Sequence, residues 1–152
     1  MNINIIAVGG IKEKFFKDAC GEYAKRISRF GKLNIYEVKE CRGGDMQDIE
    51  AEGELILKKI PPSSYVAAHC NEGNEMPSEK LAELVSDIGL NGYGSITFII
   101  GGSDGMSERV KKAANIRISF SKLTFPHQMM RVFLLEQIYR CFKINNNESY
   151  HK

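Results

Sequence analysis

The residues best placed to do chemistry lie near the end of this 152-residue chain. His127 and Arg131 stand four residues apart, so a helix would bring them to one face. An imidazole there could act as a base or donate a hydrogen bond, and the guanidinium could hold an anion or a base edge. Arg140 follows on the same segment, where Glu136 is a possible ion-pair partner. Because a lone histidine also serves as a cap or packing residue, spacing alone leaves both interpretations of His127 open.

A glycine pair, Gly101-Gly102, comes directly after a strand-like run of apolar residues. Glycines at the end of a strand let a ligand approach the backbone closely, although a tight turn explains them equally well. The pattern is neither GxGxxG nor a P-loop, since no GK[ST] follows. Dinucleotide enzymes and P-loop NTPases are therefore disfavoured.

The remaining candidates are isolated residues. His69 ends a strand-like run and is either a pocket wall or an ordinary strand residue. Tyr150 and His151 lie in a polar tail that would ordinarily be frayed. The four cysteines are scattered without a CxxC pair, which favours reduced thiols in a cytoplasmic protein. No spacing of His, Cys, Asp and Glu predicts a metal site, and no Ser or Cys stands in a nucleophile motif.

Strand-like and helix-like segments alternate about five times along the chain. Runs of β-branched and apolar residues predict strands at Ile3–Val8, Leu33–Val38, Tyr65–Cys70, Ser95–Ile100 and Ile116–Phe120. Helical spacing predicts helices at Lys12–Phe30, Asp48–Ile60 (with Asp48 as N-cap), Ser78–Leu90, Ser107–Ala114 and Pro126–Phe142 (with Pro126 as first residue). Loops are expected at Cys41–Gln47 and Asn71–Pro77. This order predicts the α/β class, with a parallel sheet covered by helices.

Ligands of such sheets bind at the carboxyl ends of the strands. The loops there are Gly9-Gly10, Cys70–Gly73, Gly101–Gly105 and Ser121–Pro126. The last helix is apolar nearly all round, with ten apolar residues among the fourteen of Met129–Phe142. Such a helix is buried on more than one side, either at the centre of the fold or in an oligomer interface.

The net charge of +2 hides a segregation of charge along the chain. Residues 1–42 carry +4, residues 43–100 carry −7 and residues 101–152 carry +5. The densest basic run lies on the first predicted helix: Lys12, Lys14, Lys17, Lys25, Arg26, Arg29 and Lys32. It is either a solvated helix face or a contact surface for phosphate backbones. The length favours a single domain, 1–152, and no run approaches the ~20 apolar residues of a membrane span.

The C-terminal third carries motifs that can be compared with a known family. These are Phe98–Gly105 (FIIGGSDG), Ser119–Val132 (SFSKLTFPHQMMRV), Glu136–Arg140 (EQIYR) and Tyr150–Lys152 (YHK). Together with Ile6–Gly9 and Glu22-Tyr23, they resemble the ribosomal RNA large subunit methyltransferase H family along the whole chain. The resemblance implies a SPOUT-type α/β knot, in which the C-terminal segment threads through a loop as a trefoil. It also implies S-adenosylmethionine as methyl donor, a homodimer, and N3-methylation of a pseudouridine in 23S rRNA of the assembled ribosome.

Position by position, the resemblance assigns cofactor contacts to His69, Gly101, Gly102, Phe120, Ser121, Lys122, Leu123, Thr124 and Phe125. Relatives usually have Leu and an acidic residue where this chain has His69-Cys70. For the chemistry we expect His127 to act as a base or orienting group and Arg131 and Arg140 to hold the substrate. Tyr150 and His151 are expected to close over the target base.

Three other functions fit parts of the sequence. A SPOUT enzyme acting on tRNA would share all the motifs above. A ribosome-associated binder could keep the fold without turnover. A flavodoxin-like nucleotide binder fits the alternation of strands and helices alone.

Overall fold

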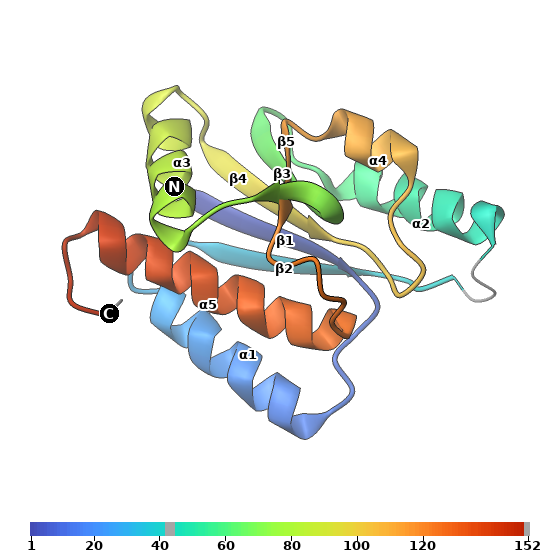
Figure 1. Ribbon diagram of the computed structural model, residues 1–152, viewed down its shortest axis with the longest axis horizontal. Helices are drawn as coiled ribbons and strands as arrows, with labels where there is room; N and C mark the ends of the chain where they lie inside the picture. The colour runs from blue at the N-terminus through green and yellow to red at the C-terminus, as the bar shows by residue number, and fades with distance from the viewer. Residues whose placement is uncertain (42–44, 151–152) are drawn as a thin grey trace.

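A five-stranded, wholly parallel sheet forms the centre of the protein (Figure 1). The computed structural model describes residues 1–41 and 45–150. The strands are β1 (Asn2–Val8), β2 (Leu33–Val38), β3 (Ser64–Glu75), β4 (Ser95–Ile100) and β5 (Ile116–Ser119), in the order β2-β1-β4-β3-β5. The helices are α1 (Lys14–Ile27), α2 (Met46–Lys59), α3 (Ser78–Leu90), α4 (Glu108–Ala113) and α5 (His127–Asn145). The predicted α/β class is confirmed.

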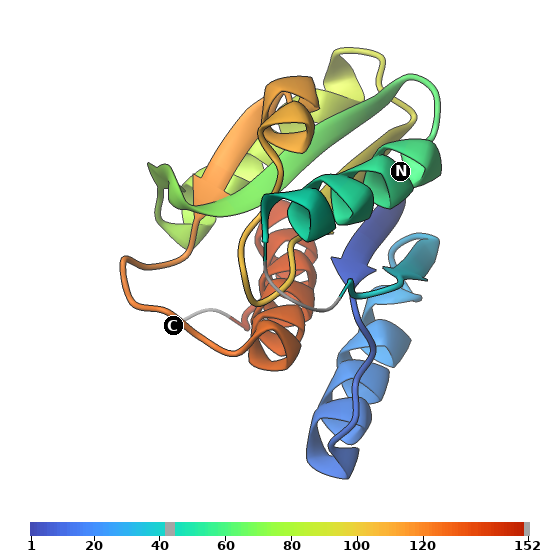
Figure 2. The same ribbon diagram turned by 90° about the vertical axis from the view of Figure 1, so that its right-hand side faces the viewer.

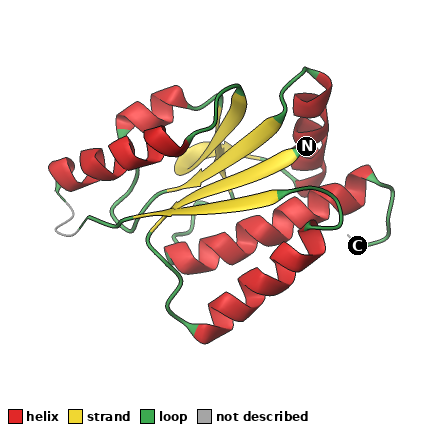
Figure 3. Cartoon of the chain, turned by 180° about the vertical axis from the view of Figure 1, so that it is seen from behind, coloured by secondary structure: helices red, strands yellow, loops and turns green. Residues whose placement is uncertain are grey.

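Helices cover both faces of the sheet: α1, α3 and α5 pack on one face, and α2 and α4 on the other (Figures 2 and 3). Successive residues of a strand point to opposite faces. Ile3 and Ile5 of β1 therefore enter the core shared with α1, α3 and α5, whereas Ile6 and Val8 enter the core shared with α2 and α4. Burial on both faces explains why β1 and β4 are nearly continuous apolar runs.

Helix α5 lies between α1 and α3, which confirms that it is central to the fold. It buries Met130, Leu134, Leu135, Ile138 and Cys141. Burial raises the pKa of the Cys141 thiol to about 12, so this cysteine is packing and not a nucleophile.

Strand β3 is longer than predicted, because it continues through the expected loop as far as Glu75. Its pairing with β5 shifts between His69 and Asn74, which both face Ile118, so the residues between them bulge out. Gly73 lies so close to β5 that a Cβ there would be 2.5 Å from the Ile118 carbonyl carbon. This polar extension has only the edge strand β5 as a partner, so it lacks the apolar pattern of a buried strand.

Helix boundaries also differ from the predictions: α1 is shorter than the predicted Lys12–Phe30, and α5 continues beyond Phe142 to Asn145. Asp45, not Asp48, caps α2, since its side chain accepts a hydrogen bond of 2.9 Å from the Asp48 N–H. Pro126 precedes α5 as its N-cap residue instead of opening the helix. Part of the loop predicted at 41–47 lies outside the described residues. Among the described helices, none combines the length and apolar character needed to cross a membrane.

Candidate active site

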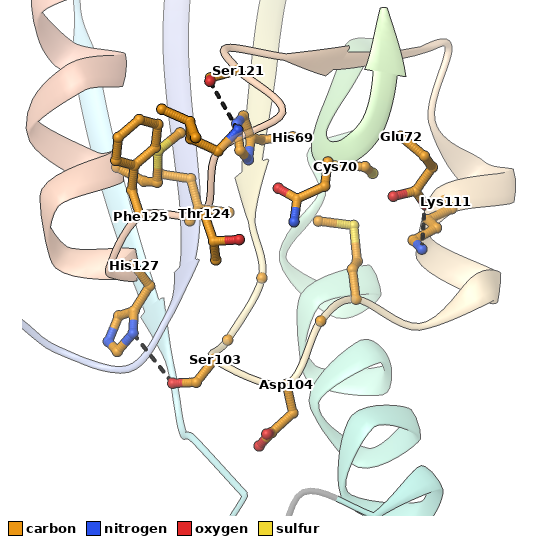
Figure 4. A pocket seen from close by; sticks show the side chains of 18 residues that line it. His69, Cys70, Glu72, Ser103, Asp104, Lys111, Ser121, Thr124, Phe125 and His127 are labelled. Carbon is orange, nitrogen blue, oxygen red and sulfur yellow. Dashed lines mark hydrogen bonds and ion pairs between the residues drawn. The ribbon is translucent and has the colours of Figure 1, made fainter.

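A cavity of about 320 Å³ opens at the carboxyl ends of β3 and β4 (Figure 4). Three of the four predicted loops form its walls: the bulge of β3, the glycine loop after β4 and the segment between β5 and α5. Seven of the nine predicted cofactor-binding residues line it: His69, Gly101, Gly102, Ser121, Leu123, Thr124 and Phe125. Lys122 is exposed and is not among the lining residues, and Phe120 faces a second cavity.

The glycine loop is a tight turn, closed by a hydrogen bond of 3.2 Å from the Gly105 N–H to the Gly102 carbonyl. A Cβ at Gly101 would lie 3.0 Å from the Gly105 carbonyl oxygen, and one at Gly102 would lie 3.1 Å from Val8 Cγ1. The turn itself therefore favours glycine at both positions, and it leaves backbone groups lining the cavity.

The segment after β5 is fixed by its own serines. The Ser119 hydroxyl donates to the Ser121 carbonyl at 2.9 Å, and the Ser121 hydroxyl accepts from the Leu123 N–H at 2.9 Å. This wall presents backbone groups and apolar side chains on one side of the cavity. Such a mixture suits a ligand with a flat apolar base and a polar tail, which fits the adenosine and amino-acid parts of S-adenosylmethionine.

His69 supplies an unused polar atom in the cavity wall. Its ring packs edge-on against Phe120 with 5.1 Å between ring centroids, and its Nε2 is buried without a hydrogen-bond partner among the described residues. Burial lowers the pKa of this imidazole, which favours the neutral ring. A buried polar atom without a partner is costly, so a ligand that hydrogen-bonds to Nε2 would remove that cost.

His127, the first residue of α5, stands at the edge of the same cavity (Figure 4). Its Nδ1 lies 3.5 Å from the Ser103 hydroxyl, which in turn donates to a Glu40 carboxylate oxygen at 3.4 Å. The predicted candidate is thus brought to the predicted cavity, with two polar groups that can orient its ring.

Arg131 is placed differently, since it lines neither cavity and is only 4% exposed. Its guanidinium donates to Glu37 at 2.6 Å and to the Gly9 carbonyl at 3.0 Å. These bonds tie α5 to the ends of β2 and β1. The sequence indicates no partner for Arg131 on its own helix, and the partner comes from another element.

Arg140 and Tyr150 meet at Glu136, which confirms the predicted Glu136–Arg140 pair. Arg140 donates to a Glu136 oxygen at 2.5 Å, and the Tyr150 hydroxyl donates to the same oxygen at 3.2 Å. The Tyr150 ring packs against Tyr139, so the expectation of a frayed tail is wrong as far as residue 150. Burial, with hydrogen bonding to Tyr23, raises the pKa of Tyr150 to about 12. His151 lies outside the described residues.

A second cavity of about 550 Å³ adjoins the first across the segment after β5, sharing Ser121 and Phe125 with it. Glu136 and Tyr23 belong to its wall. Along α5, Arg140 lies thirteen positions after His127, which corresponds to about 20 Å of helix. The described catalytic candidates are therefore separated in one chain: His127 lies at the first cavity, whereas Arg140 and Tyr150 bond to Glu136 in the wall of the second.

The sequence did not single out Lys111, although it lines the first cavity. Its ammonium pairs with Glu72 of the β3 bulge at 2.5 Å. The two residues are 39 positions apart, so no local spacing could have joined them. Within residues 1–41 and 45–150, no three His, Cys, Asp or Glu side chains are grouped to hold a metal ion.

Comparison with known proteins places this site in a family. The model of the family described as "Predicted SPOUT methyltransferase" matches residues 1–151. The chain is 48% identical to the ribosomal RNA large subunit methyltransferase H of Bifidobacterium animalis and 50% identical to that of Clostridium botulinum, over the full length of both chains in each case.

Solved structures agree in fold. A probable methylase family protein of Haemophilus influenzae superposes with a TM-score of 0.56 at 15% identity, over 99% of this chain and 70% of that one. The tRNA (m1G37) methyltransferase of Aquifex aeolicus gives a TM-score of 0.54 at 16% identity, over 92% and 70%. The chain belongs to the SPOUT methyltransferase family, among the ribosomal RNA large subunit methyltransferase H proteins, and has the SPOUT α/β fold.

Proposed function

We propose that this protein is an S-adenosylmethionine-dependent methyltransferase that modifies N3 of a pseudouridine in 23S rRNA of the assembled ribosome, in the cytoplasm. The observation that carries the proposal is the full-length similarity, at 48–50% identity, to proteins named for methylation of large-subunit ribosomal RNA. The strand-end cavity supports it, because seven of the nine residues expected to hold the cofactor line that cavity.

In this proposal the first cavity holds the methyl donor. The backbone of the glycine loop and of the segment Ser121–Phe125 would hold it, and the free Nε2 of His69 would accept or donate one hydrogen bond. The donor supplies a methyl group already activated by the sulfonium charge. The protein then has to hold the target nitrogen in line with the bond that breaks.

The imide N3 of a pseudouridine carries a proton that must leave before or during methyl transfer. His127 is the group we assign to this proton, as base or orienting donor, because it lies at the cavity edge with Ser103 and Glu40 beside it. Arg140 and Tyr150, with His151, are assigned to holding and covering the substrate. Arg131 is assigned to positioning α5, since two nitrogens of its guanidinium already donate to Glu37 and to the Gly9 carbonyl.

The separation of these groups along α5 supports a homodimer. A second copy could bring its own Arg140 and Tyr150 to the cavity that holds His127. Phe133, which is 36% exposed and lines the second cavity, offers apolar surface for such a contact. Analytical ultracentrifugation of the wild type and of Phe133→Asp tests this: we expect a dimer and a weakened dimer, and a monomeric wild type would contradict it.

The function is tested by methyl transfer from labelled S-adenosylmethionine. Assembled ribosomes, free large subunits and bulk tRNA from cells lacking the enzyme are offered, and the product is mapped by mass spectrometry. We expect methyl on a large-subunit pseudouridine only with assembled ribosomes. Transfer to tRNA would overturn the substrate, and cofactor binding without any transfer would overturn the catalytic assignment. If both His127→Ala and His151→Ala keep turnover within a few-fold of wild type, neither is the base.

The basic residues of α1, with Arg29 just after it, are the expected contact with the rRNA backbone. The reversals Lys25→Glu and Arg29→Glu should weaken ribosome binding and flatten its dependence on salt. Lys58→Glu on α2, across the sheet, is the matched control. If all three changes affect ribosome binding equally, the basic face of α1 is a solvated surface and not a specific contact with rRNA.

A further inference from the structure

One aromatic side chain stands in solvent at the start of α1. Phe15 is 65% exposed, more than any other aromatic residue in the part of the chain that the structure describes. Its neighbour Phe16 is half-buried, with the two ring centroids 4.4 Å apart. Packing therefore explains Phe16 but not Phe15. A single exposed apolar residue is ordinary, so its surroundings decide what it means.

Three lysines flank Phe15 in the sequence. Lys12, Lys14 and Lys17 are all exposed, and Lys14 pairs with Asp18 at 2.6 Å on the surface. The first turn of α1 contains no acidic residue. Positive side chains at this end of a helix are unfavourable for the helix dipole. The ion pair with Asp18 accounts for Lys14, whereas helix stability does not account for Lys12 and Lys17, and an anionic partner would.

The same segment is fastened to the candidate active site. The backbone N–H groups of Lys12 and Glu13 donate to the side-chain oxygen of Gln128 at 2.9 and 3.5 Å. Gln128 follows His127 in α5, and the loop from β1 to α1 passes this end of α5 (Figure 1). The exposed ring and its lysines thus belong to the end of the molecule where His127 lies.

We propose that Phe15 is a stacking platform for an unpaired base of RNA, with Lys12 and Lys17 contacting the phosphates on either side. An aromatic face stacks on any base, and flanking cations follow the backbone. Self-association through this face is disfavoured, because a symmetric contact between two copies would bring their lysines together. The inference rests on the proposed function in one respect, which is that this function identifies the bound nucleic acid as RNA.

Fluorescence anisotropy separates stacking from charge. Binding is measured to a labelled oligouridine decamer and to an abasic decamer with the same phosphates. Phe15→Ala should weaken binding of the uridine decamer about tenfold without changing binding of the abasic one, and Phe15→Trp should retain both. Lys12→Gln should weaken both and reduce the salt dependence. Leu90→Ala, which truncates an 83% exposed apolar residue at the end of α3, is the matched control.

An equal loss on both decamers, or no loss from Phe15→Ala, would overturn the proposal. A change from dimer to monomer in analytical ultracentrifugation of Phe15→Ala would also overturn the proposal, because this face would then be a contact between two copies of the chain. Methyl transfer by the wild type to ribosomes is measured in parallel. If the wild type transfers methyl and Phe15→Ala binds like wild type, only the stacking inference fails. If the wild type transfers to no RNA, the proposed function fails whatever the decamers give.

Discussion

Replacing Arg131 with Met should loosen the fold more than the chemistry. In the folded protein the Arg131 guanidinium joins the start of α5 to Glu37 of β2 and to the Gly9 carbonyl after β1. Methionine keeps much of the side-chain length and apolar volume but removes both hydrogen bonds. An arginine that held substrate would behave in the opposite way, with little effect on stability and a large effect on rate.

The size of the effect follows from the two bonds. Hydrogen bonds to charged groups contribute about 1.5–3 kcal/mol each, and breaking a fully buried ion pair costs about 3–5 kcal/mol. The Glu37 side chain is 47% exposed, so water replaces much of what it loses. We therefore expect Arg131→Met to lower the free energy of unfolding by about 2–3 kcal/mol, which lowers the Tm by about 4–12 °C.

Urea unfolding and thermal melting measure the stability, and methyl transfer is measured well below the melting transition. Transfer per folded molecule should stay within about tenfold of wild type, or 1.4 kcal/mol in the barrier. Arg109→Met is the matched control, because Arg109 pairs with Glu54 on the surface with side-chain exposures of 59% and 47%. That pair should contribute no more than about 1 kcal/mol.

An unchanged Tm in Arg131→Met, together with a loss of transfer greater than about a hundredfold, would refute this reasoning. It would mean that Arg131 leaves Glu37 to hold the substrate. A double-mutant cycle with Glu37→Gln gives an independent check, since residues in direct contact should show coupling and distant ones should not.

Four further outcomes are expected. Burial raises the pKa of the Glu52 carboxyl, so the folded state carries an unfavourable charge above that pKa. Glu52→Gln should therefore raise the free energy of unfolding at pH 8. In urea titrations the gain should vanish well below pH 4.5, where the carboxyl is protonated in both states. Burial lowers the pKa of His69, so the wild type should lose stability as the pH falls below 6.5, where the unfolded state binds the proton more readily. His69→Leu should lose less stability in the same titration. If the free energy of unfolding falls equally with pH in both proteins, this expectation is wrong. Absorbance titration of the wild type should show one tyrosine with a pKa of about 12, absent from Tyr150→Phe. S-adenosylmethionine at 100 times its Kd should stabilise the fold by about 2.7 kcal/mol in thermal melting, and an unshifted Tm would argue against the cofactor site.

The sheet could be predicted from the sequence where burial dictates the residues. Ile3–Val8 and Ser95–Ile100 are covered on both faces, so their apolar runs mark them as strands. The extension of β3 over Asn71–Glu75 could not be predicted in this way, because polar residues on an edge pairing carry no such pattern. The threading of the C-terminal segment stays a prediction from the resemblance, since the alternation of elements contains no information about knots.

The contacts of the candidate site also differ in whether the sequence could predict them. The Glu136–Arg140 pair could be predicted because residues four apart on a helix lie on the same face, where opposite charges can pair. Glu37 lies 94 positions from Arg131, and their contact depends on the strand order that puts β2 beside β1 and α5 over both. Spacing thus predicts contacts within one helix, whereas contacts between elements need the fold.

The central position of α5 has a consequence for how the protein is made. It leaves the ribosome after α1 and α3 during synthesis, yet both of these helices pack against it, and its Arg131 bonds to a residue 122 positions earlier. Until α5 emerges, the apolar faces of α1 and α3 lack their common partner, and such surfaces promote aggregation. A chain that terminates before α5 should therefore leave these apolar faces of α1 and α3 uncovered and should aggregate or be degraded.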